Sequence, residues 1–263
     1  MKVIKQRFRV IPVIDLKDGM VVHGVKGERD KYQPLKSLLT SSTECKVVVA
    51  DLMRKLSLQE FYLADLDAII SSGEHNQFQL IPSKNNSGFN LVSMMVDAGI
   101  TDKASALKAL ESGIDRVVIG TETLQSLGAL REITSNIESH RLVASIDVQD
   151  NRVLSPNKGL AKLTPPEAIL EISKTGIREF ILLQLSRVGT GSGVDRKLIL
   201  KCLEACDQSH SFSHLPATLV LGGGVSEYED LRWLAANGVG GVLIATALHN
   251  GSIDQKMIQQ LNS

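Results

Sequence analysis

Two aspartates that each end an apolar run are the residues in this sequence best placed to do chemistry. Asp15 ends the run 11–14, and Asp147 ends the run 143–146. Each is followed by an apolar residue, a polar residue, an aspartate, and then a glycine or an asparagine. The two lie 132 positions apart, close to half of the 263-residue chain. Two carboxyl groups in unlike surroundings can act as proton donor and proton acceptor, so the pattern indicates acid–base chemistry.

The order of the elements predicts the scaffold that would position these carboxyl groups. Short apolar runs, which we interpret as strands, alternate eight times with stretches of helical pattern. Their expected ranges are 10–14, 61–64, 91–96, 116–119, 142–146, 179–183, 218–221 and 241–244. Eight strand–helix pairs predict an α/β fold, a closed (βα)8 TIM barrel, which needs about 250 residues. An open doubly wound sheet is the alternative, but the Gly-x-Gly-x-x-Gly that would support it is absent after the first strand.

Internal repetition favours the barrel. Residues 117–121 match residues 242–246, and residues 96–100 match residues 221–225, both at an offset of 125. We therefore predict one barrel over residues 1–263, built from half-barrels of about 1–125 and 126–263. The first and fifth strands of such a barrel are opposed, so the two aspartates should face each other across its mouth. The alternative is that each aspartate caps the turn or helix that follows it.

Polar residues before the helical stretches predict where helices begin. Thr43 and Ser226 are expected as N-caps, and Thr164 is expected as a cap with Pro165 in the first turn.

Glycine-rich turns after the last two strands predict a phosphate site. Gly222, Gly223 and Gly224 let backbone N–H groups approach a ligand, beside the start of the next helix. Ala245 and Thr246 add N–H groups after the eighth strand. The alternative is a tight turn that only needs positive φ angles.

The corresponding residues of the first half predict a weaker anion site. They are Gly99, Gly120 and Thr121. Only one glycine remains in the turn 97–99, and Asp97 would repel a phosphate if it pointed inward.

Residues near two other strand ends are auxiliary candidates. Asp65 follows the second strand, where a role in the site and a role as a turn cap fit the sequence equally. Arg187, Gly189 and Thr190 belong to the loop 187–193, expected either as a mobile lid over the mouth or as a solvated loop. The six histidines show no metal-ligand spacing, so no metal is expected.

Composition limits the partners and the location. The 29 basic residues balance the 29 acidic ones, which gives no electrostatic reason to expect nucleic acid or an anionic membrane as a partner. No apolar run reaches the ~20 residues of a membrane span, and the first residues lack a signal-peptide pattern. We expect a cytoplasmic monomer or small homo-oligomer whose partner is a small phosphorylated substrate.

Taken together, the motifs resemble those of the histidine-biosynthesis barrel family. They are Ile-Pro-x-Ile-Asp-Leu-Lys-Asp-Gly at 11–19, Ala-Asp-Leu-Asp at 64–67, Ile-Asp-Val at 146–148, the loop 186–193, Gly-Gly-Val at 223–225 and Ile-x-Thr-Ala-Leu at 244–248. That family holds the phosphoribosylformimino-AICAR ribotide isomerase and the cyclase subunit of imidazole glycerol phosphate synthase. The resemblance implies a duplicated half-barrel and a ligand with two phosphates. It also implies a cofactor-free Amadori rearrangement in which Asp15 and Asp147 act as acid and base.

The sequence departs from the family's pattern at two loops. The family usually has Gly-Gly-Gly-Ile-Arg after the third strand, where this chain has Asp-Ala-Gly-Ile-Thr at 97–101. Leu183 and residues 188–190 replace a threonine and Asp-Gly-Thr near the sixth strand. With these departures, the sequence resembles a divergent branch of the family that occurs in methanogens and methylotrophs. Besides the histidine-pathway isomerase, they leave open a barrel enzyme of one-carbon coenzyme (methanopterin or methanofuran) biosynthesis and a non-catalytic module that binds a phosphorylated ligand.

Overall fold

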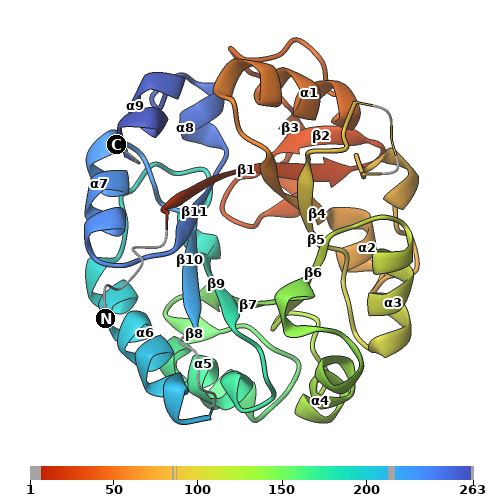
Figure 1. Ribbon diagram of the computed structural model, residues 1–263, viewed down its shortest axis with the longest axis vertical. Coiled ribbons are helices and arrows are strands. Elements are labelled where there is room, and N and C mark those ends of the chain that lie inside the picture. Colours follow the sequence, from red (N-terminus) through yellow and green to blue (C-terminus); the bar gives the residue numbers. More distant parts are fainter. Residues whose placement is uncertain (1–6, 85, 87, 213–216, 262–263) are drawn as a thin grey trace.

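Within residues 7–84, 86, 88–212 and 217–261, which the computed structural model describes, eight parallel strands close into a barrel (Figure 1). β11 pairs with β1 from Arg9–Gly241 to Pro12–Ile244, which closes the sheet on itself and confirms the predicted (βα)8 fold. The barrel strands are β1 (Arg9–Lys17), β4 (Glu60–Asp65), β5 (Ser93–Asp97), β6 (Arg116–Gly120), β7 (Leu142–Gln149), β9 (Glu179–Gln184), β10 (Thr218–Gly222) and β11 (Gly241–Ile244).

Helices surround the barrel and cover its outer face (Figure 1). Their apolar residues recur every three or four positions, as Val48, Val49 and Leu52 do in α1, and these side chains are fully buried. Because the strands are buried on both faces, they appear in the sequence as continuous apolar runs. The helices are α1 (Cys45–Leu56), α2 (Leu66–Ile70), α3 (Lys103–Glu111), α4 (Leu127–Asn136), α5 (Pro165–Ser173), α6 (Arg196–Gln208), α7 (Tyr228–Ala236), α8 (Thr246–His249) and α9 (Gln255–Gln260).

Successive strand residues alternate between two apolar cores. In β1, Val10 and Ile14 pack beneath the helices, whereas Ile11 packs inside the barrel with inward residues of the other strands. The same alternation brings Asp15 and Asp147 to the inward face at the C-terminal ends of β1 and β7. These strands are four places apart in either direction around the barrel, so they are opposed as predicted.

An ion-pair network closes the N-terminal end of the barrel. Arg9, Glu60, Arg116 and Glu179 are the first residues of β1, β4, β6 and β9. The Arg9 guanidinium group lies 3.0 Å from Glu60 Oε1 and 2.9 Å from Glu179 Oε1. Arg116 contacts the same two glutamates. Four strands are thereby held together at the end opposite the two aspartates.

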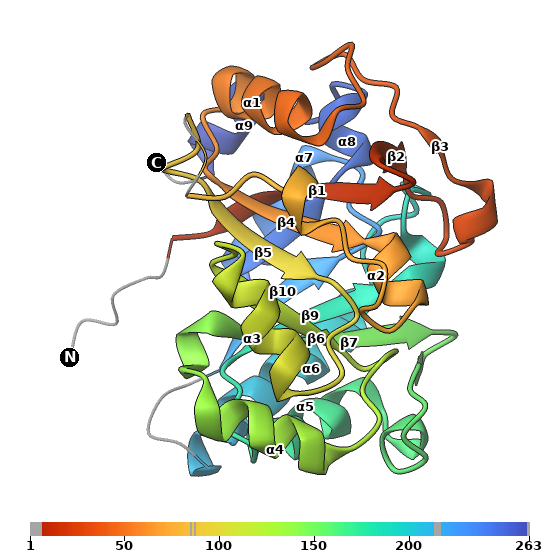
Figure 2. The same ribbon diagram turned by 90° about the vertical axis from the view of Figure 1, so that its right-hand side faces the viewer.

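The other end carries short antiparallel extensions. β1 turns back into β2 (Met20–His23), which pairs with β3 (Gln33–Pro34), and β7 pairs with β8 (Arg152–Val153). Figure 2 shows the barrel from the side, with the β2–β3 extension beyond the end to which the strands point. We call residues 24–32, which connect β2 to β3, the β2–β3 loop.

Two predicted helix caps are wrong and one helix start is right. α1 begins at Cys45 after Glu44, and α7 begins at Tyr228 after Glu227. The Ser226 hydroxyl instead donates to the carboxylate of Asp230, two residues inside α7. α5 begins at Pro165 directly after Thr164, as predicted. Among the described residues no helix is long and apolar enough to span a membrane.

Candidate active site

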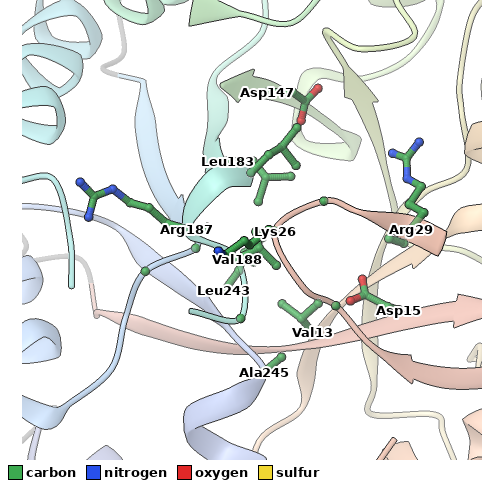
Figure 3. A pocket seen from close by; sticks show the side chains of 18 of the residues that line it. Val13, Asp15, Lys26, Arg29, Asp147, Leu183, Arg187, Val188, Leu243 and Ala245 are labelled. Atoms are coloured by element: carbon green, nitrogen blue, oxygen red, sulfur yellow. The ribbon is translucent and has the colours of Figure 1, made fainter. Parts of the chain in front are cut away.

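A cavity lies at the C-terminal ends of the barrel strands (Figure 3). Its wall combines strand ends from all round the barrel with the β2–β3 loop and the loop after β9. Asp15 and Asp147 both line it, and their side chains come from opposite sides. The acid pair predicted from the sequence therefore belongs to a single cavity.

Asp15 presents a loosely held carboxyl group. Within the described residues no group donates a hydrogen bond to it, and the nearest charge that opposes its own is Arg29. A Cβ on Gly24 would lie 2.5 Å from Asp15 Oδ2, so the absence of a side chain at Gly24 makes room for the carboxylate. Burial raises the Asp15 pKa to about 7, and the positive charge of Arg29 only partly opposes that shift.

Asp147 is fixed by four hydrogen bonds. The Ser145 hydroxyl donates to Oδ1 at 2.7 Å, and Oδ2 accepts from the Thr121 hydroxyl at 3.2 Å and the Glu122 N–H at 3.0 Å. The Asp147 N–H donates back to Thr121 Oγ1 at 2.9 Å. Burial, followed by the negative charge of Glu122, raises the Asp147 pKa to about 6, against the effect of these hydrogen bonds. Both aspartates can therefore gain or lose a proton near neutral pH.

The glycine-rich turn lines the cavity on the β10–β11 side. Gly222, Gly223, Gly224, Ala245 and Thr246 all face it. Gly223 and Gly224 have φ angles of 89° and 92°, and a Cβ on Gly224 would lie 2.5 Å from the Gly193 carbonyl oxygen. In the described part of the chain, the N–H groups of Gly224, Ala245 and Thr246 donate to no protein acceptor. These donors are free for an anionic ligand.

The loop after β9 packs beside this turn. The Arg187 guanidinium group donates to the Gly193 carbonyl oxygen at 2.9 Å, which holds the side chain near Gly224. Gly189 also lines the cavity, whereas Thr190 is exposed and its hydroxyl donates to the Arg187 carbonyl oxygen. The Lys26 N–H donates to the Val188 carbonyl oxygen at 2.8 Å, and Gly189 packs against Gly24. The β2–β3 loop and the loop after β9 are thus in direct contact.

The remaining candidates lie behind or beside the cavity wall. Thr121 and Gly120 support Asp147, as a hydrogen-bonding partner and as a close neighbour of its carboxylate. Gly99 faces α2, where a Cβ would lie 2.7 Å from the Ala68 carbonyl oxygen. Asp65 is fully buried and accepts from the Ala68 N–H at the start of α2 and from the Gln77 N–H. Asp65 is therefore the N-cap of helix α2, whereas the sequence had predicted either a role in the site or a turn cap.

Several cavity residues were not candidates from the sequence, and four of them matter for the chemistry of the site. Asp97, Glu122, Tyr62 and Arg29 line the wall between β4 and β7. Arg29 forms an ion pair with Glu122. Burial, then the negative charge of Asp147, raises the Asp97 pKa to about 8. Strand alternation could have found two of them, because Tyr62 lies two residues before the inward Ala64 and Asp97 two residues after the inward Met95.

Comparison with known proteins agrees with this architecture. The family model described as histidine biosynthesis protein matches residues 9–254. The chain belongs to this family. That result confirms the resemblance drawn from the sequence motifs.

Relatives within the histidine biosynthesis family differ in how much is known of them. An uncharacterized protein of Methanocaldococcus jannaschii is 31% identical over 252 residues, which cover 95% of this chain and 97% of that one. Two relatives are named 1-(5-phosphoribosyl)-5-((5-phosphoribosylamino)methylideneamino)imidazole-4-carboxamide isomerase. The one from Deinococcus radiodurans is 28% identical over 251 residues, and the one from Methanothermobacter thermautotrophicus is 26% identical over 248. Each match covers 93% of this chain and 95% of the relative.

Proposed function

We propose that the protein is a cofactor-independent isomerase that converts the aldose form of a phosphorylated sugar amine into the ketose form. One observation carries the proposal: Asp15 and Asp147 line one cavity from opposed strands, with pKa values of about 7 and about 6. An Amadori rearrangement needs such a pair, because one proton must be delivered and another removed on opposite sides of the sugar.

The reaction has four proton transfers, and the pair can serve them in turn as acid and base. A carboxylic acid protonates the ring oxygen, the bond from C1 to that oxygen breaks, and the nitrogen lone pair forms a protonated Schiff base. A carboxylate then removes the proton from C2, which gives an enaminol. Return of a proton to C1 and loss of the hydroxyl proton at C2 give the aminoketose. Atoms and electrons balance within the substrate, so no oxidant or reductant is required.

The β10–β11 side of the cavity offers an anchor for a phosphate. The free N–H groups of Gly224, Ala245 and Thr246 point to an anion, and Arg187 provides a positive charge nearby. The printed names of two relatives refer to phosphoribosyl substrates, which fits a phosphate at this place.

Asparagine variants test the proposal. Asp15→Asn and Asp147→Asn should each lower kcat on the bisphosphorylated ribotide of the named relatives by roughly 10²- to 10⁴-fold. Binding of inorganic phosphate should stay close to wild type, and circular dichroism melting shows that each variant folds. Asp18→Asn is the matched control, because Asp18 lies exposed in the β1–β2 turn and outside the cavity. Wild-type turnover in either cavity variant would overturn the assignment.

A second candidate keeps the chemistry and changes the substrate to a phosphorylated amine of one-carbon coenzyme (methanopterin or methanofuran) biosynthesis. Two features of the turn after β5 favour it, because both oppose a second phosphate there. Asp97 faces the cavity, and Gly99 faces α2 and not the cavity. Complementation of a strain lacking the histidine-pathway isomerase separates the two candidates. Rescue that depends on Asp15 and Asp147 supports the first, whereas failure of an expressed, folded, phosphate-binding protein to rescue supports the second.

A further inference from the structure

We infer that the cavity wall opposite the glycine-rich turn binds a cationic amine of the substrate. The ligand would then carry a phosphate at one end and an ammonium group at the other, in place of two phosphates. This inference rests on the proposed function and favours its second candidate, because the substrate would not be the bisphosphorylated ribotide. We call Tyr62, Asp97, Glu122 and Asp147 together the acidic wall.

Two carboxyl groups of the acidic wall lie side by side. A Cβ on Gly120 would meet Asp147 Oδ2 at 3.1 Å and Asp97 Oδ2 at 3.3 Å, so both oxygens flank the same glycine. Asp97 is only 7% exposed and Asp147 only 3%. When both groups are ionised, their two negative charges repel each other in this buried place, and a bound cation would remove the repulsion.

The hydroxyl group of Tyr62 is an independent sign of a missing polar ligand. Tyr62 is 4% exposed and lines the cavity, and within the described residues its hydroxyl has no hydrogen-bond partner. The charges of Asp97 and Asp147 help to raise the Tyr62 pKa, which places the phenol within their field. Although the Tyr62 side chain is buried, its oxygen is accessible from the cavity and can therefore contact a ligand. An ammonium group has three N–H donors, enough for the phenol oxygen and both carboxylates.

The acidic wall already holds one cation. Arg29 pairs with Glu122, and the charges of Glu122 and Asp97 help to raise the Arg29 pKa. Among the described residues no cation forms an ion pair with Asp97 or Asp147, although the charge of Arg29 acts on Asp97 from a distance. Figure 3 shows Arg187 on the far side of the cavity, pointing away from Asp15 and Asp147. The cavity is therefore polarised, with Asp97 and Asp147 at the acidic wall and the free N–H donors at the glycine-rich turn.

A second phosphate would be disfavoured at the acidic wall. Its charge would meet Asp97 and Asp147 directly. The Gly99 N–H, which would otherwise be free in the turn after β5, donates to Asp97 Oδ1 at 3.2 Å. Asp97 thus takes the place of a bound anion in that turn.

Calorimetric titration with three series of probes tests the inference. The probes are alkyl monophosphates, ω-aminoalkyl phosphates and α,ω-alkanediol bisphosphates of graded and matched chain length. At its best length the aminoalkyl phosphate should bind wild-type protein at least about tenfold more tightly than the matched monophosphate. The bisphosphate should show no such gain. Asp97→Asn should abolish the preference for the amine, and Asp97→Gly should also improve bisphosphate binding.

Glu28→Gln is the matched control. Glu28 lines the same cavity and loses one negative charge in the variant, but its side chain is exposed and outside the acidic wall. The preference for the amine should persist there. Circular dichroism melting of each variant shows that it folds.

Each outcome decides a different point. Equal or tighter binding of the bisphosphate by wild-type protein, or an amine preference that survives in folded Asp97→Asn, overturns the inference and leaves the phosphate site standing. Failure of all three series to bind overturns both the inference and the phosphate site of the proposed function.

Discussion

The guanidinium group of Arg29 pairs with the carboxylate of Glu122 at the mouth of the barrel. Arg29 belongs to the β2–β3 loop and Glu122 to the turn after β6, and 93 residues separate them in the chain. Both side chains are largely buried, at 27% and 19% exposure. The β2–β3 loop is thereby anchored to the wall that carries Asp97 and Asp147.

Separating this pair should cost measurable stability. In a double-mutant cycle with Arg29→Gln and Glu122→Gln, we expect a coupling free energy of about 1 kcal/mol, measured by urea unfolding. The pair Lys31–Glu28 in the same loop is the control, because its side chains are 66% and 45% exposed. Its cycle should give a coupling near zero. Equal coupling in the two cycles would contradict an anchoring role for Arg29.

Asp97 should make stability depend on pH. Burial raises its pKa from 3.8 to about 8, so between these values the folded protein keeps a proton that the unfolded chain has released. The free energy of unfolding must then fall as the pH rises through that range. Asp97→Asn removes this dependence, and it should raise Tm at about pH 8 by roughly 2–4 °C for each kcal/mol relieved.

Thermal unfolding of wild type and Asp97→Asn from about pH 5 to about pH 8.5 measures this effect. The slope that remains in the variant combines the raised pKa values of Asp15, Asp147 and Asp65 with the lowered pKa values of His23 and His249. Asp18→Asn, at the exposed turn, should track the wild-type curve. Parallel curves for wild type and Asp97→Asn would show that Asp97 does not bind the proton.

A methyl group at Gly224 should disrupt the turn that carries the free N–H groups. Gly224→Ala combines a φ angle of 92° with a contact of 2.5 Å to the Gly193 carbonyl oxygen. Gly238→Ala is a close control, since its φ angle is 85° and nothing lies within 4 Å of the new Cβ. The control should lose about 1 kcal/mol of stability from backbone strain alone. Gly224→Ala should lose more, and its affinity for alkyl monophosphates should fall at least about tenfold, measured by calorimetry.

Removing one member of the ion-pair network should destabilise the barrel without changing the structure of the cavity. Arg116→Met leaves Glu60 and Glu179 with Arg9 as their shared partner, and we expect a loss of about 3 kcal/mol in urea unfolding. Arg232→Met breaks only an exposed pair with Glu229 on α7, and its loss should stay below about 0.5 kcal/mol. Phosphate binding should be unchanged in both variants. Similar losses in the two would mean that the network adds nothing beyond a surface pair.

The barrel could be predicted from the sequence because its strands are apolar on both faces and end in polar residues. That pattern identified all eight strands and the opposed pair of aspartates. The five-residue helix α2 was missed, since five residues are too few to show a helical period. Its cap, Asp65, was visible only as a polar residue at a strand end.

The acidic wall was harder to predict. The sequence showed that an inward Asp97 would oppose a phosphate, but it could not show the direction of the side chain or the neighbouring Asp147. Arg29 and Glu122 were missed because their contact joins two loops far apart in the chain. Thr43 and Ser226 were wrong as caps because a nearby hydroxyl group is only one of several ways to satisfy the first N–H groups of a helix.

The contact between the β2–β3 loop and the loop after β9 has a kinetic consequence. The Lys26 N–H is bonded to the Val188 carbonyl oxygen, and Gly189 packs against Gly24, so neither loop can swing outward without breaking its hold on the other. The first loop carries Arg29, next to the aspartates, and the second carries Arg187, next to the glycine-rich turn. Any outward movement that keeps this contact would uncover both ends of a bound ligand together, in a single kinetic step.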